Sequence, residues 1–132
     1  MAELRVVLVT PEETLFDRSA ASVRVPMFDG SAGIYPARAP LVGRLGVGEL
    51  KLNGTDGSTE SYFVDSGFIQ VKGNQVSLLT HAAQPLSEID RTAAQAELET
   101  ANAEKAVGDA EYTVLAHRQE RARQLLSLSS RN

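Results

Sequence analysis

Two prolines punctuate the segment Gly33-Ile34-Tyr35-Pro36-Ala37-Arg38-Ala39-Pro40-Leu41. Each proline fixes its own φ and lacks a backbone N–H donor, so the segment is excluded from helices and central strands. The residues before the prolines, Tyr35 and Ala39, are restricted to extended geometry. We therefore expect a stiff, extended crossing on a β scaffold that exposes one cation, Arg38. A rigid loop between two strands, with no partner, would show the same pattern.

Short segments of alternating polarity flank this crossing. Leu4 to Val9 alternates and ends at Thr10-Pro11, and glycines 43, 46 and 48 indicate that the strand after the crossing is bent. Ser66-Gly67 is expected to be a turn between strands, and Gly73-Asn74 a tight two-residue hairpin. The other expected strands lie near residues 14–16, 21–25, 41–47, 49–53, 60–65, 68–72 and 75–79.

The periodicity changes at Pro85. Ser87 followed by Asp90 is a helix start signal, and the chain is then rich in alanine, without proline or glycine, as far as Ala106. Gly108 breaks this run, and Asp109 can cap a second helix that ends near residue 128. The sequence thus predicts an α+β chain: an N-terminal β-sandwich of about eight to ten short strands in residues 1–84, followed by a C-terminal antiparallel α-helical hairpin in residues 85–132.

Composition narrows the classes of function. The 132 residues have a formal net charge of −4, which argues against general nucleic-acid binding, and no cysteine, which excludes disulfides and thiolate metal sites. No apolar run reaches the 18 residues that a membrane span needs, and the N-terminal residues lack the layout of a signal or transit peptide. We expect the protein to fold in the compartment where it is made and to meet a membrane only through partners.

A search for catalytic chemistry finds no candidate residues. His81 and His117 do not lie at metal-ligand spacing from other ligands, the glycines form no phosphate-binding loop, and no serine sits in a nucleophile elbow. We therefore predict a protein that is not an enzyme and that holds no metal or cofactor.

The two expected helices differ in charge and bury little. The first is acidic, with Glu97, Glu99 and Glu104 among its charges, whereas the second contains Arg118, Arg121 and Arg123. These charges could be solvated faces with helix-supporting pairs, or the arginines could bind an acidic partner. Because alanine contributes far less burial energy than leucine, a hairpin of this composition should dock weakly and is suited to moving between positions.

The same residues resemble those of a known family, the epsilon subunit of the rotary ATP synthase. Its members have a Gly-Ile-(Leu/Tyr/Phe)-Pro-x-(His/Arg)-x-Pro-(Leu/Ile) segment, which residues 33–41 match. The resemblance extends to Val47-Gly48-Glu49-Leu50, to Ser66-Gly67-Phe68 and to Ile89-Asp90 at the start of an alanine-rich helical pair. Many members have histidine where this chain has Arg38.

This resemblance implies a non-catalytic central-stalk subunit that joins the gamma subunit to the ring of c subunits and couples proton or sodium flow to ATP synthesis. One face of the sandwich would hold gamma. The loop Asp29-Gly30-Ser31, together with the crossing and Arg38, would rest on the c-ring. The hairpin would extend into the catalytic head of alpha and beta subunits and block ATP hydrolysis. The protein would lie peripherally on the cytoplasmic face of the plasma membrane, or on the stromal face of the thylakoid in a plastid.

An alternative function is that of a free-standing nucleotide sensor. Some family members bind ATP on the hairpin through an Ile/Leu-Asp-x-x-Arg-Ala motif, which Ile89 and Asp90 match, but Ala93 occupies the arginine position. Arg91 lies about 200° around the helix from that position, because a helix has 3.6 residues per turn, and cannot substitute for it. The motif is degraded, and we expect weak ATP binding or none.

Overall fold

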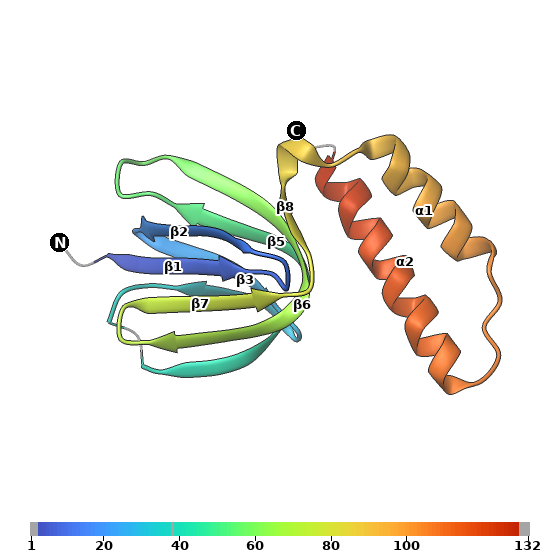
Figure 1. The fold of residues 1–132 in the computed structure, drawn as a ribbon, viewed down its shortest axis with the longest axis horizontal. Helices are drawn as coiled ribbons and strands as arrows, with labels where there is room; N and C mark the ends of the chain where they lie inside the picture. The colour runs from blue at the N-terminus through green and yellow to red at the C-terminus, as the bar shows by residue number, and fades with distance from the viewer. Residues whose placement is uncertain (1–2, 38, 130–132) are drawn as a thin grey trace. The chain divides into compact units, whose positions relative to one another are not determined.

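The computed structural model describes residues 3–37 and 39–129. The chain divides into two compact units, Met1–Pro85 and Leu86–Asn132. The first is a β-sandwich and the second consists of two helices preceded by a short 3₁₀ turn (Figure 1). This architecture confirms the predicted fold class, a sandwich of about eight strands followed by a helical hairpin.

The sandwich is a single hydrogen-bonded sheet with the strand order β2-β1-β7-β6-β5-β3-β4, and β8 pairs with β6 beside this path. All neighbouring strands are antiparallel except β1 and β7, which are parallel. The strands are β1 (Leu4–Val9), β2 (Thr14–Ala20), β3 (Ser22–Met27), β4 (Gly30–Ile34), β5 (Leu41–Asn53), β6 (Thr59–Lys72), β7 (Gln75–Thr80) and β8 (Ala83–Pro85).

The two longest strands belong to both layers of the sandwich. The first half of β5 and the second half of β6 lie with β7, β1 and β2, whereas their other halves lie with β3, β4 and β8. The strands change layer where Leu45 pairs with Gly67 and Val47 pairs with Asp65. Ser66-Gly67 is therefore a kink inside β6, and the prediction of a turn that separates two strands was wrong. The kink bends the strand without adding a residue or ending its pairing, because the register with β5 is the same on both sides of it, so four expected short strands are two long ones.

Backbone geometry explains why small residues occupy this corner. Ser66 and Gly67 have φ values of 58° and 126°, and a Cβ on Gly67 would lie 1.9 Å from the Leu79 carbonyl oxygen. On the opposite strand, a Cβ on Gly46 would lie 2.8 Å from the Met27 carbonyl oxygen. The corner thus requires glycine for close approach of backbones on both strands.

The side chain of Thr80 holds the kink in place through hydrogen bonds. Its hydroxyl donates a 2.7 Å hydrogen bond to the Ser66 carbonyl oxygen and accepts one of 3.3 Å from the Asp65 N–H. The Asp65 N–H also donates to the Ala82 carbonyl oxygen, at 2.9 Å. Thr80 and Asp65 are both buried, so these bonds satisfy polar groups that water does not reach.

The core lies between the two layers and is formed by alternate residues of every strand except β8. Val6, Val25 and Ile34 are fully buried there, and Phe16 and Tyr62 form a tilted ring pair with centroids 5.0 Å apart. Such alternation is the pattern expected of strands with one face on a core. The other core residues are Leu4, Leu8, Ala20, Val23, Leu45, Leu50, Leu52, Val64, Ile69, Val71, Val76 and Leu78.

Residues 35–37 and 39–40 of the proline-rich crossing connect β4 to β5 without strand pairing, as the sequence predicts, but a turn at Pro36-Ala37 replaces the expected extended geometry. Ala37 adopts a φ of 65°, and its N–H donates a 3.0 Å hydrogen bond to the Asn74 side-chain oxygen. Asn74 lies in the two-residue turn between β6 and β7, which confirms the predicted hairpin with Gly73 at positive φ. The crossing is thereby tied to the neighbouring hairpin.

The second unit contains the 3₁₀ turn η1 (Leu86–Glu88) and the helices α1 (Arg91–Ala103) and α2 (Asp109–Ser129). Asp90 caps α1, because its side chain accepts a 3.1 Å bond from the Ala93 N–H. The prediction that Ser87 opens the helix was therefore wrong, since η1 takes up this stretch. α1 also ends three residues before Ala106, while the break at Gly108 is confirmed by its φ of 86°.

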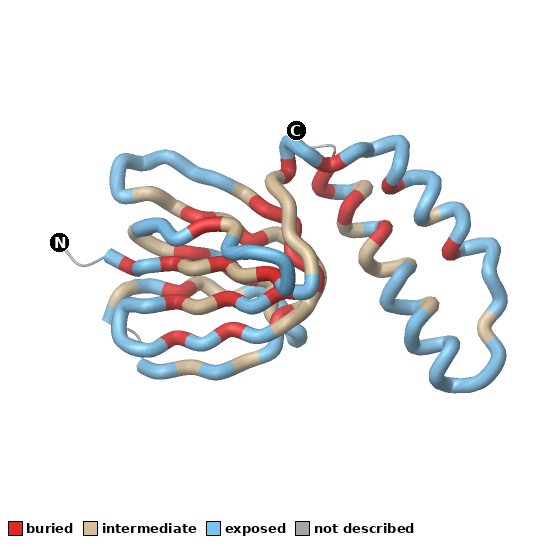
Figure 2. Tube along the Cα trace, in the orientation of Figure 1, coloured by how far each residue is buried: buried red, intermediate tan, exposed pale blue. Residues whose placement is uncertain are grey.

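Small side chains account for most of the burial on α1. Its buried residues are Ala94 and Ala101, and Leu98 is half-buried. On α2 the buried residues all lie in the C-terminal half: Ala122, Leu125, Leu128 and Ser129. Figure 2 shows the contrast between the strands of the sandwich, where buried positions recur, and the largely exposed α1. Each alanine methyl contributes roughly 0.8 kcal/mol when buried, against about 1.5 to 3 for a leucine.

We predict that Gly67→Ala destabilises the chain by about 3 kcal/mol or more, because the new methyl group collides with the β7 backbone at a positive φ. Urea denaturation of the full chain measures this loss. Gly57→Ala is the matched control: Gly57 has a φ of 86° but no atom within 4 Å of the added Cβ, so only about 1 to 2 kcal/mol is expected. Equal losses for the two variants would contradict the steric explanation.

Candidate partner-binding surfaces

The predicted ring-contact residues lie at two ends of one strand. Asp29 lies in the exposed turn between β3 and β4, and Gly30, with a φ of 137°, and Ser31 are the exposed first residues of β4. Ser31 accepts a 3.1 Å hydrogen bond from the Arg24 guanidinium. The proline-rich crossing begins at the other end of β4, roughly 15 Å away at 3.3 Å per residue. Arg38 lies outside the described residues.

A largely apolar and mostly exposed row of side chains, which the sequence analysis missed, crosses the sandwich beside this turn. Strand register places Arg44 of β5 opposite Phe68 of β6, Phe68 opposite Leu79 of β7, and Leu79 opposite Val9 of β1. Their side chains leave the sheet on the side away from the core, because the alternating neighbours Leu45, Ile69, Leu78 and Leu8 are the buried ones. We call Arg44, Phe68, Leu79 and Val9 the outer row.

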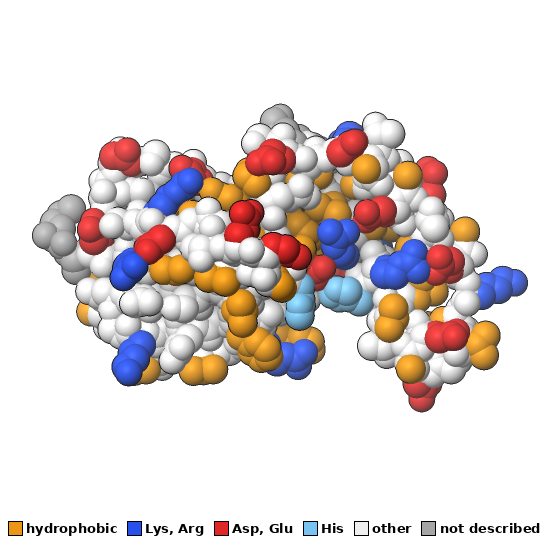
Figure 3. Space-filling model, in the orientation of Figure 1, with side chains coloured by type: hydrophobic (Ala, Val, Ile, Leu, Met, Phe, Trp, Pro, Cys, Tyr) orange, Lys and Arg blue, Asp and Glu red, His pale blue; other side chains and the backbone are white. Residues whose placement is uncertain are grey.

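Large apolar side chains in and beside the outer row are exposed to solvent. Phe68 is 57% exposed and Leu79 52%, and Val42, one step along β5, is 75% exposed. Phe28 of the β3–β4 turn extends the row, because the Arg44 guanidinium lies 4.6 Å from the centre of its ring and the Phe28 N–H donates to the Arg44 carbonyl oxygen. Hydrophobic patches on the surface of the sandwich are visible in Figure 3. The turn and the outer row therefore form one continuous surface.

Polar groups border this surface. On the same outer side of the sheet, Arg5 of β1 and Asp17 of β2 form a bidentate ion pair of 2.9 and 2.5 Å. The hydrogen bond from Arg5 lowers the pKa of Asp17 below its ordinary value. An apolar centre with a charged border is the arrangement found in protein–protein interfaces. The signal in the sequence was Phe68-Ile69, since two adjacent large apolar residues in a strand cannot both face one core.

The hairpin arginines, predicted to bind an acidic partner, are paired within the hairpin. Arg118 contacts Glu104 at 2.5 Å, and Arg121 contacts Glu97 at 3.1 Å, both across the two helices. Arg123 contacts Glu120 at 3.0 Å, one turn earlier on α2. The hydrogen bond and charge of Glu104 raise the pKa of Arg118 further. Acidic and basic side chains accordingly lie interleaved on the hairpin in Figure 3.

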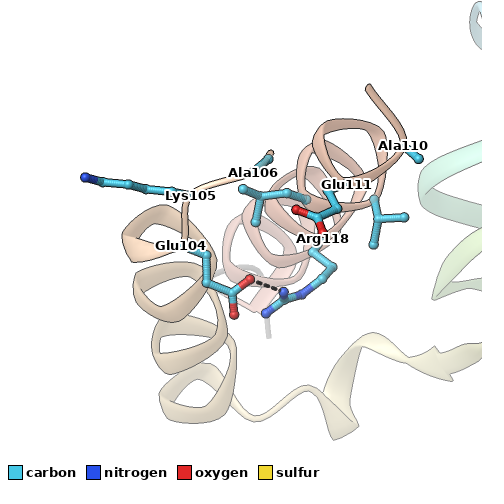
Figure 4. Close-up of a pocket in the computed structure, with 8 residues that line it drawn as sticks. Glu104, Lys105, Ala106, Ala110, Glu111 and Arg118 are labelled. Atoms are coloured by element: carbon cyan, nitrogen blue, oxygen red, sulfur yellow. Dashed lines mark hydrogen bonds and ion pairs between the residues drawn. The ribbon is translucent and has the colours of Figure 1, made fainter. Parts of the chain in front are cut away.

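A cavity of about 330 Å³ opens where the two helices are joined. Its lining mixes signs, with Glu104 and Glu111 beside Lys105 and Arg118, and Figure 4 shows Glu104 and Arg118 pointing toward each other across it. Glu111 also accepts a 2.9 Å hydrogen bond from the Val107 N–H. Carboxylates on the wall disfavour a phosphate group, so this cavity is a poor site for a nucleotide.

The two residues that match the nucleotide motif, Ile89 and Asp90, contribute to the structure of the hairpin. Asp90 is the N-cap of α1, and Ile89, just before it, is 7% exposed. Ala93, at the position of the motif's arginine, supplies the N–H that Asp90 binds. Among the described residues, no three His, Asp or Glu side chains cluster as metal ligands, and no helix is long and apolar enough to cross a membrane.

Comparisons with a family model and with known proteins indicate the same family. Residues 3–86 match the family model described as "ATP synthase, Delta/Epsilon chain, beta-sandwich domain". The chain is 49% identical to the "ATP synthase epsilon chain" of Rhodopirellula baltica over 87 residues, which is 66% of this chain and 67% of that protein. It is 34% identical to the "ATP synthase epsilon chain" of Bordetella petrii over 95% of both chains.

Solved structures share the fold. A chain in the cryo-EM structure of Euglena gracilis mitochondrial ATP synthase, which contains OSCP, F1 and the c-ring, matches with a TM-score of 0.85 and 23% identity, over 96% of this chain and 81% of that one. A chain in the central stalk and c-ring of the Tetrahymena thermophila mitochondrial enzyme matches with a TM-score of 0.72 and 16% identity, over 97% of both. The chain therefore belongs to the family of ATP synthase epsilon subunits, which are non-catalytic subunits of the enzyme's central stalk, as its resemblance to that family predicted.

Proposed function

We propose that the sandwich joins the gamma subunit to the c-ring and so helps couple proton or sodium flow to ATP synthesis. The observation that carries this proposal is the outer row, an exposed apolar surface continuous with the β3–β4 turn. Exposed apolar patches of this kind mark interaction sites, because leaving them in water is unfavourable. Relatives named as epsilon chains, and neighbours from stalk and c-ring assemblies, support gamma and the ring as the partners.

The two partners would use adjacent parts of this surface. Gamma would cover the outer row, where Phe68 and Leu79 supply the apolar area. The c-ring would meet the end of the β3–β4 hairpin, Asp29 of the turn with Gly30 and Ser31 of β4, whose strand pairing limits the entropy lost on binding. The proline-rich crossing and Arg38 form a second proposed ring contact, at the other end of β4. Such a subunit would be peripheral to the membrane, on the cytoplasmic or stromal face that bears the catalytic head.

Replacing an outward-facing residue tests the gamma contact without disturbing the core. We predict that Phe68→Glu leaves the melting temperature of the isolated chain nearly unchanged and weakens its binding to gamma about tenfold to a hundredfold, since burying a Phe contributes roughly 1.5 to 3 kcal/mol. Binding is measured by titration of purified gamma. Thr59→Glu, at an exposed position of β6 outside the outer row, is the control. If both variants bind gamma equally well, the outer row is not the gamma contact.

We also propose that the hairpin restrains ATP hydrolysis by extending toward the alpha and beta subunits. Its helices bury few large side chains, so a partner can compete for them. The arginines at positions 118, 121 and 123 lie within two turns of α2 and provide charges for an acidic surface of the head.

Deleting residues 86–132 should raise ATP hydrolysis by the assembled enzyme and leave synthesis largely intact. Replacing the three arginines with alanine should raise hydrolysis more mildly, because only the charged part of the contact is lost. Both rates are measured on membrane vesicles at low and moderate salt. Wild-type hydrolysis in both variants would show that the hairpin is not an inhibitor.

The alternative, a nucleotide sensor, lacks support from the hairpin's geometry. A triphosphate needs clustered cations, whereas Arg118 and Arg121 already contact carboxylates and Asp90 caps a helix. We predict no ATP binding tighter than about 1 mM by titration calorimetry of the full chain. Tighter binding that is lost in Arg118→Ala or Arg121→Ala would restore the sensor hypothesis, and Arg24→Ala, in the sandwich, is the control.

A further inference from the structure

The contact between α1 and α2 contains two ion pairs that bridge the helices. Glu97, on α1, contacts Arg121, and Glu104, the C-cap residue of α1, contacts Arg118. We propose that Glu97 and Glu104 form an electrostatic latch that closes the hairpin and occupies two of the arginines needed for docking on an acidic partner. The latch itself is a property of the isolated chain, and its regulatory consequence rests on the proposed inhibitory function.

Ion pairs contribute substantially to the contact between α1 and α2, because the apolar part of this contact is small. Ala94 and Ala101 are the buried residues of α1, two turns apart, and alanine stripes bring helices close but remove little surface from water. A 3.3 Å bond from the Gln119 amide to the Ala101 carbonyl oxygen also joins the helices. Charge pairing therefore makes up a larger share of this contact than it does in a leucine-rich hairpin.

The ion pairs of the latch can be broken readily, because their side chains are partly exposed to solvent. The side chains of the Arg118–Glu104 pair are 44% and 46% exposed, and those of the Arg121–Glu97 pair 30% and 55%. Exposed pairs are weak individually and are screened by salt. Both pairs break when the hairpin opens, and the carboxylates of a partner can then bind both arginines in place of Glu97 and Glu104. The latch is therefore suited to reversible opening.

Opening the hairpin changes the charge that α2 presents. In the closed hairpin, Glu97 and Glu104 offset the charge of Arg121 and Arg118, around a groove of about 260 Å³ lined by Glu97, Arg118 and Arg121. When α1 leaves, these two pairs are lost together. The third pair, Arg123–Glu120, lies within α2 and persists. α1 thus acts as an internal competitor of the acidic partner.

The absence of cysteine allows the latch to be tested on the full chain. Ala96→Cys and Ala116→Cys, both exposed and one on each helix, carry spin labels for pulsed electron resonance distance measurements. In this background E97Q/E104Q should raise the long-distance, open population about twofold to tenfold, the range expected for loss of two exposed pairs. Raising the salt concentration should open the parent chain and have little effect on the variant.

E99Q/E120Q is the matched control. It removes the same number of negative charges, one from each helix, but Glu99 accepts from Gln95 within α1 and Glu120 accepts from Arg123 within α2. The control should leave the distance distribution unchanged. The charge exchange E104R/R118E should remain closed, which separates lost pairing from general damage to the hairpin. Equal distributions for E97Q/E104Q and E99Q/E120Q, or an open E104R/R118E hairpin, would overturn the latch.

Hydrolysis by the assembled enzyme separates the latch from the inhibitory role. If both hold, E97Q/E104Q lowers hydrolysis relative to E99Q/E120Q, because the open hairpin docks more readily. If E97Q/E104Q opens the hairpin in the isolated chain but leaves hydrolysis unchanged, the latch is supported and the proposed inhibitory function fails.

Discussion

The sandwich depends on the corner at which β5 and β6 pass from one layer to the other. Gly46 and the Ser66-Gly67 kink allow two long strands to bend together, and Thr80 holds the kink through bonds to the backbone of Asp65 and Ser66. Without this bend the halves of β5 and β6 would continue in one flat sheet, with no second layer to cover their apolar side. A Cβ on Gly67 would lie 1.9 Å from the Leu79 carbonyl oxygen, which shows how closely the kink fits β7.

The same corner determines which residues face a partner. The kink, with positive φ at Ser66 and Gly67, sets the phase of the second half of β6, so that Ile69 and Val71 enter the core while Phe68 and Gln70 face outward. Register then aligns Phe68 with Arg44 and Leu79, and Arg44 with Phe28 of the β3–β4 turn. A surface that combines an apolar centre with a polar turn thus follows from a backbone irregularity, and it suits a subunit that must hold two different partners.

The hairpin is stabilised by different interactions from those of the sandwich. Its helices have strong local signals, with an alanine-rich α1 and Asp90 as a cap, but their mutual contact relies on methyl groups and exposed ion pairs. Helices of this kind form readily and separate at low cost. The two units therefore match the two functions proposed for them, a rigid connection in the sandwich and a conditional contact in the hairpin.

Local chemistry in the sequence determined the element types, the unpaired crossing at Pro36 and Pro40, the Gly73-Asn74 hairpin and the family, because each depends on residues that are near each other in the chain. Tertiary structure decided the rest. Ser66-Gly67 resembles a turn in isolation and is a kink within one strand only because β5 pairs on both sides of it. The outer row joins residues from three consecutive strands and β1, so only register brings it together. The pairing of Arg118 and Arg121 with α1 depends on which helix faces meet, and a one-dimensional charge pattern does not contain that information.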